Sequence, residues 1–132
     1  MCVGNACRSP MAEGFANRYG RDVLVALSSG LAPIAKVPQE TVAAMRERGV
    51  DVSEHVPQLY DPREVAECGL VVNLAGIRLT GIPPKKLIEW KVDDPFGESY
   101  ETYRSVRDDL EQRVMRLILD LRLQATKENI HK

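Results

Sequence analysis

The chain has 132 residues, of which 44% are hydrophobic and 28% charged, and its formal net charge is -1. This size and composition suit one globular domain that covers residues 1–132. A nearly neutral chain offers no bulk electrostatic attraction for nucleic acid or anionic membranes, and its apolar runs are too short to span a bilayer.

The predicted elements alternate between helices and strands. Residues 10–19 are expected to form a helix, because Pro10 suits a first helical position and Gly20 an end. A short β-rich run follows at residues 23–28, and a second helix is expected at 39–48. The remaining shorter elements are a helix at 62–67 and strands at 70–74 and 87–92.

The last predicted element is a long amphipathic helix. Apolar residues recur there at steps of three and four, which places them on one helical face. They are Tyr103, Val106, Leu110, Val114, Leu117 and Leu121. Strands that alternate with helices predict an α/β fold, a three-layer sandwich with a mostly parallel central sheet flanked by helices.

The three cysteines indicate a reducing environment. Three is an odd number for a disulfide framework, and Cys2 and Cys7 lie only five positions apart. Met1 is followed at once by a polar loop sequence rather than by an apolar signal segment. We therefore expect a cytoplasmic protein with reduced thiols.

The segment from Cys2 to Arg8 reads Cys-Val-Gly-Asn-Ala-Cys-Arg and leads into Ser9 and Pro10. A thiol is nucleophilic as thiolate, and a helix N-terminus, backbone N–H groups and a guanidinium all favour that form. The same donors bind a tetrahedral oxyanion, to which Arg8 offers a bidentate fork. The spacing predicts a site for phosphate or arsenate, with Cys2 as nucleophile.

The residues inside this loop have roles that fit such a site. Gly4 permits close backbone approach or a positive φ. Asn5 tolerates left-handed geometry and is placed to hydrogen-bond across the loop. Ser9 is expected either to cap the helix or to donate its hydroxyl to the Cys2 sulfur. The expected phosphate-binding residues are Val3, Gly4, Asn5, Ala6, Cys7 and Arg8.

Transfer of a phosphoryl group also needs an acid for the leaving oxygen. Asp94 is the best candidate, since Pro95 stiffens its loop and a predicted strand ends just before it, where α/β sites are built. Asp-Pro and the nearby Gly97 are also turn formers. On the residues alone, a general acid and a simple turn are therefore equally supported. Phe96, beside Asp94, suits an entrance wall or the core.

Other candidate residues are expected to be structural. A lone histidine such as His55 supports no metal site, so we expect neither a metal nor a cofactor. Trp90 is expected to pack in the core. Cys68 is expected to act as a small buried hydrophobe at the start of a strand.

The string from Cys2 to Glu13, with the later Asp94-Pro95, resembles the low molecular weight protein tyrosine phosphatases and the related thioredoxin-coupled arsenate reductases. The resemblance implies a phosphocysteine intermediate on Cys2, phosphoryl oxygens bound by Arg8, and a loop ordered by Asn5. It implies that Asp94 is the general acid and later activates water, without a metal. It also implies a reversible disulfide between Cys7 and Cys2; packing of Cys7 under the loop is the alternative.

One feature does not fit the predicted fold completely. A phosphate-binding loop normally follows a central strand, yet only Met1 precedes Cys2, so we expect the first strand to be missing from the sequence. Three explanations remain open. The chain is shortened or its start is misassigned, the second and third strands lie side by side, or a second chain fills the gap and makes a homodimer.

The branch of the family is also open. Arg8-Ser9-Pro10 resembles the phosphatases, whereas residues 11–16 and 94–97 resemble the reductases. The reductases carry a further cysteine at the end of the third strand, where this chain has Ala75. We expect a phosphomonoester hydrolase that acts on a phosphorylated protein or a small aryl phosphate. The alternatives are an arsenate reductase that uses an external thiol, and an anion-binding protein impaired by the absent strand.

Overall fold

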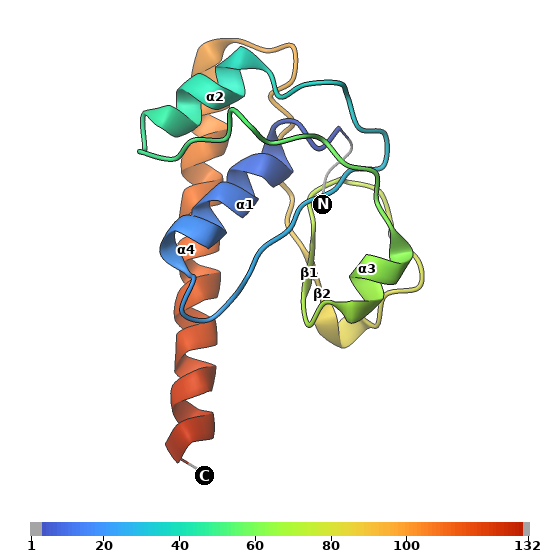
Figure 1. Ribbon diagram of the computed structural model, residues 1–132, viewed down its shortest axis with the longest axis vertical. Coiled ribbons are helices and arrows are strands. Elements are labelled where there is room, and N and C mark those ends of the chain that lie inside the picture. The colour runs from blue at the N-terminus through green and yellow to red at the C-terminus, as the bar shows by residue number, and fades with distance from the viewer. Residues whose placement is uncertain (1–3, 131–132) are drawn as a thin grey trace.

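The computed structural model describes residues 4–130 and has an α/β architecture (Figure 1). A parallel two-stranded sheet pairs Val71 with Leu87 and Asn73 with Glu89. Helices flank this sheet: α1 and α4 lie on one side of the strands and α3 on the other. The elements are α1 (Arg8–Tyr19), α2 (Gln39–Arg46), α3 (Pro62–Glu67), β1 (Val71–Asn73), the 3-10 helix η1 (Pro84–Lys86), β2 (Leu87–Glu89) and α4 (Tyr100–Ile130).

Local signals explain where the helices begin and end. The Asp61 side chain caps α3 by accepting a hydrogen bond from the Arg63 N–H at 2.9 Å, and Pro62 occupies the first helical position. The chain leaves α2 through Gly49, which has a φ of 73°. The three shorter predicted helices are therefore confirmed, with bounds that shift by two residues at most. The long amphipathic helix is also confirmed, and it extends beyond the predicted stripe at both ends.

The core lies mainly between α1 and α4. Met11 and Phe15 of α1 and Leu110 and Ile118 of α4 are fully buried in one cluster. Burial of each such side chain contributes about 1.5–3 kcal/mol. Gly20 permits close contact of the two helices, because a Cβ there would lie 2.8 Å from Cγ1 of Ile118. The helix pair thus provides the rigid support on which the loop before α1 rests.

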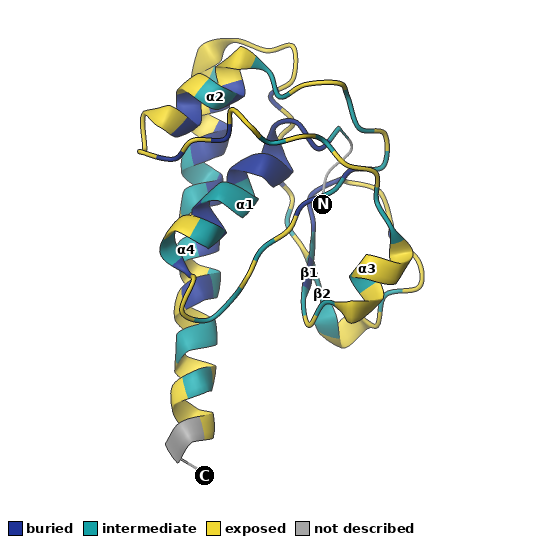
Figure 2. Cartoon of the chain, viewed as in Figure 1, coloured by how far each residue is buried: buried dark blue, intermediate teal, exposed yellow. Residues whose placement is uncertain are grey.

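The buried face of α4 follows the predicted stripe through Val114 and then departs from it. Ile118 is buried, whereas Leu117 and Leu121 are only half-buried. Figure 2 shows the buried positions along the upper part of α4 and mostly exposed ones along its lower part. Within residues 4–130, no helix has the length and hydropathy that crossing a membrane requires.

The strand predicted at residues 23–28 is wrong. This segment begins in a turn, in which the N–H groups of Val23 and Leu24 both donate to the Gly20 carbonyl. Further along, the Asn17 side chain donates to the Ala26 carbonyl at 3.0 Å and accepts from the Ala26 N–H at 2.9 Å. Val25 and Leu27 are 87% and 71% exposed. A strand needs a neighbouring strand, and residues 4–130 supply none here. The strands predicted at 70–74 and 87–92 exist but are shorter. The absence of a strand before Cys2 stays a prediction.

Candidate functional site

The predicted anion-binding loop leads directly into α1, whose first residue is Arg8. Asn5 has a φ of 50°, the left-handed conformation expected for it. Gly4 does not take a positive φ; its carbonyl accepts a hydrogen bond from the Ile34 N–H at 3.1 Å. Cys2 and Val3 lie outside the described residues. The chain therefore turns at Asn5 and presents the N-terminus of α1, where anions are favoured.

The buried Asn5 side chain joins the loop to three other parts of the chain. Its amide donates to the hydroxyls of Ser9 at 2.9 Å and Ser28 at 3.0 Å. Its carbonyl oxygen accepts from the Gln58 N–H at 2.8 Å. Ser9 does not cap α1, because Cys7 occupies the cap position without a side-chain bond. These bonds hold the loop in one conformation.

His55 supports the loop from the opposite side of Asn5. Its Nε2 lies 3.1 Å from Oδ1 of Asn5, and its Nδ1 lies 3.2 Å from Oε2 of Glu13. Oε2 of Glu13 also accepts from the Ser28 hydroxyl at 3.2 Å. A doubly protonated imidazole donates to both oxygens, whereas a neutral one donates to only one. The sequence predicted a structural His55 but not these partners. Of these partners, only Glu13 could have been placed near the loop from the sequence, because it lies four positions after Ser9 and so on the same face of α1.

The Arg8 side chain reaches the carboxyl ends of both strands. Its Nη1 donates to the carbonyl oxygen of Leu74, just after β1, and at 3.1 Å to that of Val92, beyond β2. Its Nε is buried and has no hydrogen-bond partner among the described residues. The guanidinium therefore lies at the edge of the sheet where parallel α/β folds bind their ligands.

Asp94 lies beside Arg8. Its Oδ2 is 3.6 Å from Nη2 of Arg8, and its side chain is 50% exposed. Oδ1 of Asp94 also accepts the Phe96 N–H at 3.1 Å, as in a turn. The structure thus brings together an arginine and a carboxylate that are far apart in the sequence, and Asp94 is also a turn residue. Phe96 is exposed next to it, whereas Trp90 packs against the core.

Ala6 and Cys7 of the loop are buried in the core cluster. Burial, followed by the neighbouring Cys7 thiol, raises the pKa of Tyr103 to about 12. Cys7 therefore packs against α4, as the second of its two predicted roles requires. Its disulfide with Cys2 involves a residue outside the described ones.

Cys68 and Ala75 lie near opposite ends of β1. Cys68 is only partly buried, so the expectation of a buried hydrophobe is wrong; its thiol donates to the Glu64 carbonyl of α3 at 3.4 Å. Ala75 is buried beyond the other end of the strand, beside the Leu74 carbonyl that Arg8 contacts. At ~3.3 Å per residue, an extended chain would separate Cys68 from this end by roughly 20 Å. Among the described side chains, no group of three or more histidines, cysteines or carboxylates is arranged to hold a metal ion.

The comparisons with known proteins agree with this geometry. The family described as low molecular weight phosphotyrosine protein phosphatase matches residues 1–129. The chain belongs to the low molecular weight phosphotyrosine protein phosphatase family. This membership confirms the resemblance and the α/β fold. It also places the chain among relatives that are enzymes, both phosphatases and arsenate reductases.

Both branches of the family occur among the similar proteins. A glutaredoxin arsenate reductase from Synechocystis sp. is 32% identical over 123 residues, which are 89% of this chain and 92% of the relative. An arsenate reductase in the phosphate binding state aligns with a TM-score of 0.78, 31% identity and 91% and 94% coverage of the two chains. A low molecular weight protein tyrosine phosphatase from T. tengcongensis aligns with a TM-score of 0.77, 25% identity and 90% and 95% coverage.

Proposed function

We propose that the protein hydrolyses phosphomonoesters, with a phosphorylated protein or a small aryl phosphate as substrate, in a reducing compartment such as the cytoplasm. The observation that carries the proposal is the pairing of Arg8 with Asp94, 3.6 Å apart, at the end of the ordered loop. Arg8 offers a buried guanidinium whose Nε has no hydrogen-bond partner within residues 4–130. Asp94 offers a half-exposed carboxyl group beside it. One binds an oxyanion and the other exchanges a proton with solvent or substrate.

The proposed reaction has two steps. The Cys2 thiolate attacks phosphorus and the bond to the leaving oxygen breaks, while Asp94 donates a proton to that oxygen. Water then attacks the phosphocysteine, Asp94 accepts a proton from it, and the sulfur–phosphorus bond breaks to release phosphate. Arg8 and loop N–H groups bind the phosphoryl oxygens in both steps. Asn5 and Ser9 act indirectly, through the bonds that hold the loop.

The test compares two substrates and four proteins. Wild type should hydrolyse p-nitrophenyl phosphate, and Cys2→Ser should be inactive. Asp94→Ala should lower kcat by about 10²–10⁴ for phenyl phosphate, whose leaving group needs a proton, and by less for p-nitrophenyl phosphate. Asp93→Ala is the matched control and should stay near wild type. Equal losses for both substrates would contradict Asp94 as the acid.

A second candidate function is arsenate reduction, which the name of the Synechocystis relative supports. Cys2 would displace a hydroxyl group from arsenate, and a thiol would then attack the Cys2 sulfur. The sulfur–arsenic bond would break, arsenic(V) would leave as arsenite, and a mixed disulfide would form. Because Ala75 replaces a cysteine and Cys68 lies near the other end of β1, that thiol would come from a small molecule such as glutathione.

The same proteins separate the candidate functions. Arsenate-dependent oxidation of glutathione without phosphatase activity would favour the reductase. Stabilisation by phosphate in a thermal-shift titration, without turnover of either substrate, would favour an impaired anion-binding protein. If the protein shows no turnover of any substrate and no stabilisation by phosphate, the assignment of the loop as an oxyanion site is wrong.

A further inference from the structure

The outer face of α4 carries a short apolar row, although the core lies on the opposite face. Leu119 and Leu123 are 55% and 62% exposed. They continue a row that starts at Met115, at steps of four residues, so the three side chains lie on one side of the helix. The buried residues Leu110, Val114 and Ile118 line the other side. A surface helix normally carries polar residues opposite its core face, so this row suits a partner surface.

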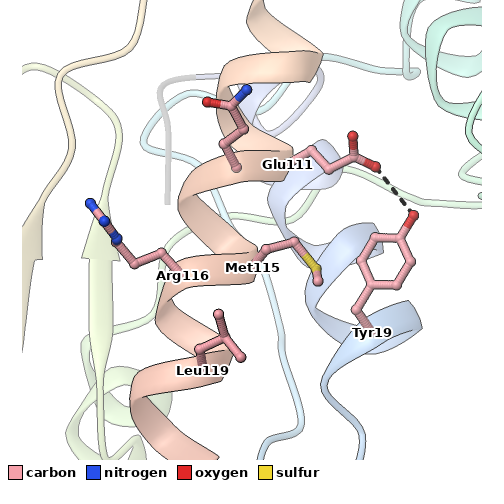
Figure 3. A pocket seen from close by; sticks show the side chains of 6 residues that line it. Tyr19, Glu111, Met115, Arg116 and Leu119 are labelled. Atoms are coloured by element: carbon pink, nitrogen blue, oxygen red, sulfur yellow. Dashed lines mark hydrogen bonds between the residues drawn. The ribbon is translucent and has the colours of Figure 1, made fainter.

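Figure 3 shows this face at close range. Met115 and Leu119 project from α4 into a shallow hollow, with Tyr19 of α1 at one side. The Tyr19 hydroxyl is held there by Glu111 at 3.2 Å. Arg116 projects away from Tyr19, on the other flank of the hollow. The hollow thus has an apolar floor, one aromatic wall and one cationic flank.

α4 also extends beyond the part of the molecule that packs against it. At about 1.5 Å per residue, its 31 residues span roughly 46 Å. Ile118 is its last buried residue among the described side chains. Figure 1 shows the following turns projecting past the other elements. A second helix therefore has access to this stretch.

We propose that two copies of the chain associate through this face, with their α4 helices antiparallel and related by a two-fold axis at Leu119. A two-fold interface must be complementary to itself, and this face meets that condition. Leu119 faces Leu119 of the other copy. Positions equally distant from Leu119 then face one another, so that Met115 meets Leu123 and Gln112 meets Thr126.

The charges beside the row fit the same arrangement. Arg116 and Asp120 lie on the same flank of the face, three positions before and one position after Leu119. The two-fold axis places Arg116 of one copy within ~3 Å, along the helix axis, of Asp120 in the other. Neither residue has an ion-pair partner among the described residues. By contrast, Arg122 on the other flank is bound to Asp22. The dimer thus forms two symmetric ion pairs, each between Arg116 of one copy and Asp120 of the other.

The size of the surface sets the expected strength. One helix face buries less than the ~800 Å² per partner of a standard stable complex. We therefore expect a reversible dimer with a Kd on the order of 10 µM. Sedimentation velocity between about 1 and 500 µM should show a monomer that converts to a dimer. A chain that stays monomeric over this range, or that forms higher oligomers, overturns the proposal.

Two variants test the apolar row. Leu119→Glu places two carboxylates on the axis and should weaken the dimer at least 100-fold. Leu27→Glu changes a leucine of the segment at 23–28 that is even more exposed, 71% against 55% for Leu119, and should leave the Kd unchanged. Both side chains are exposed, so both variants should retain the wild-type circular dichroism. A dimer that survives Leu119→Glu, or is lost in Leu27→Glu, places the interface elsewhere.

A charge exchange tests the orientation. Arg116→Asp and Asp120→Arg should each weaken self-association several-fold, because like charges then meet across the axis. A mixture of the two variants should associate at least as tightly as wild type, since every contact in the mixed dimer joins opposite charges. Pairing inside one helix cannot produce this rescue. Failure of the mixture to recover would exclude the antiparallel arrangement.

Discussion

Asn5 combines an unusual backbone conformation with a side chain whose amide nitrogen and carbonyl oxygen both make hydrogen bonds. Its φ of 50° suits asparagine better than most residues, because its short polar side chain is tolerated in the left-handed region. Its carboxamide bonds Ser9, Ser28 and the Gln58 N–H, and it also faces His55. At this scale the loop depends on one residue that both turns the chain and ties it to three segments.

Two substitutions separate these contributions. Asn5→Gly keeps the backbone conformation but loses the bonds, and should lower the free energy of unfolding by about 1–3 kcal/mol. Asn5→Ala also introduces left-handed strain and should lose roughly 1 kcal/mol more. Urea denaturation of the three proteins measures both differences. Equal stability of the Gly and Ala variants would show that the strain contributes nothing, and wild-type stability of both would discount the hydrogen bonds.

Tyr103 carries a pH-dependent contribution to stability. Burial, followed by the Cys7 thiol, raises the pKa of Tyr103 to about 12, above its ordinary value of 10. The folded state therefore favours the protonated phenol, and this contribution is complete below pH 10 and is lost as the pH rises from 10 to 12. Tyr103→Phe should lose less stability across this interval than wild type. Denaturant titrations at pH 9, 10, 11 and 12 measure the difference; parallel losses would contradict the assignment.

Among the helices, Arg107 links α2 to α4. Its side chain is buried and donates to the Ala44 carbonyl at 3.0 Å and to Asp108 at 2.7 Å. Its Nη1 also lies 3.3 Å from Oε1 of Glu47. Nε of Arg104, a more exposed side chain, lies at the same distance from that oxygen. The two arginines therefore share one partner but differ in burial.

Substitution of each arginine by methionine should show the effect of that burial. Arg107→Met leaves the Ala44 carbonyl without its donor and should lower the free energy of unfolding by about 1–3 kcal/mol. Arg104→Met removes an exposed pair and should cost less than about 0.5 kcal/mol. Chemical denaturation compares them. Equal losses would mean that Arg107 acts only as a surface charge.

The strands depend on tertiary context more than the helices do. β1 and β2 pair over three residues each, whereas the segment at 23–28 forms no strand. Its β-branched and apolar composition predicted a strand, and that prediction was wrong. Propensity describes a single segment, whereas a strand requires a second one at the right place.

For the whole molecule, the helix pair α1 and α4 supplies the buried core, and the strands bring distant residues to one edge of the sheet. Arg8 begins α1 and Asp94 follows β2, and the fold places them 3.6 Å apart. The outer face of α4 lies opposite the core and belongs to a different surface. The proposed catalytic site and the proposed dimer interface therefore use separate parts of the chain.

The sequence by itself determined the helices, the loop motif and the identities of Arg8 and Asp94 as candidates, because caps, helical periodicity and motif spacing are local properties. It left Asp94 undecided between acid and turn. Only the tertiary structure decided that Asp94 lies beside Arg8, that His55 and Glu13 support Asn5, and that residues 23–28 form no strand. These outcomes depend on contacts between residues far apart in the chain, and no local pattern encodes which distant partner a side chain meets.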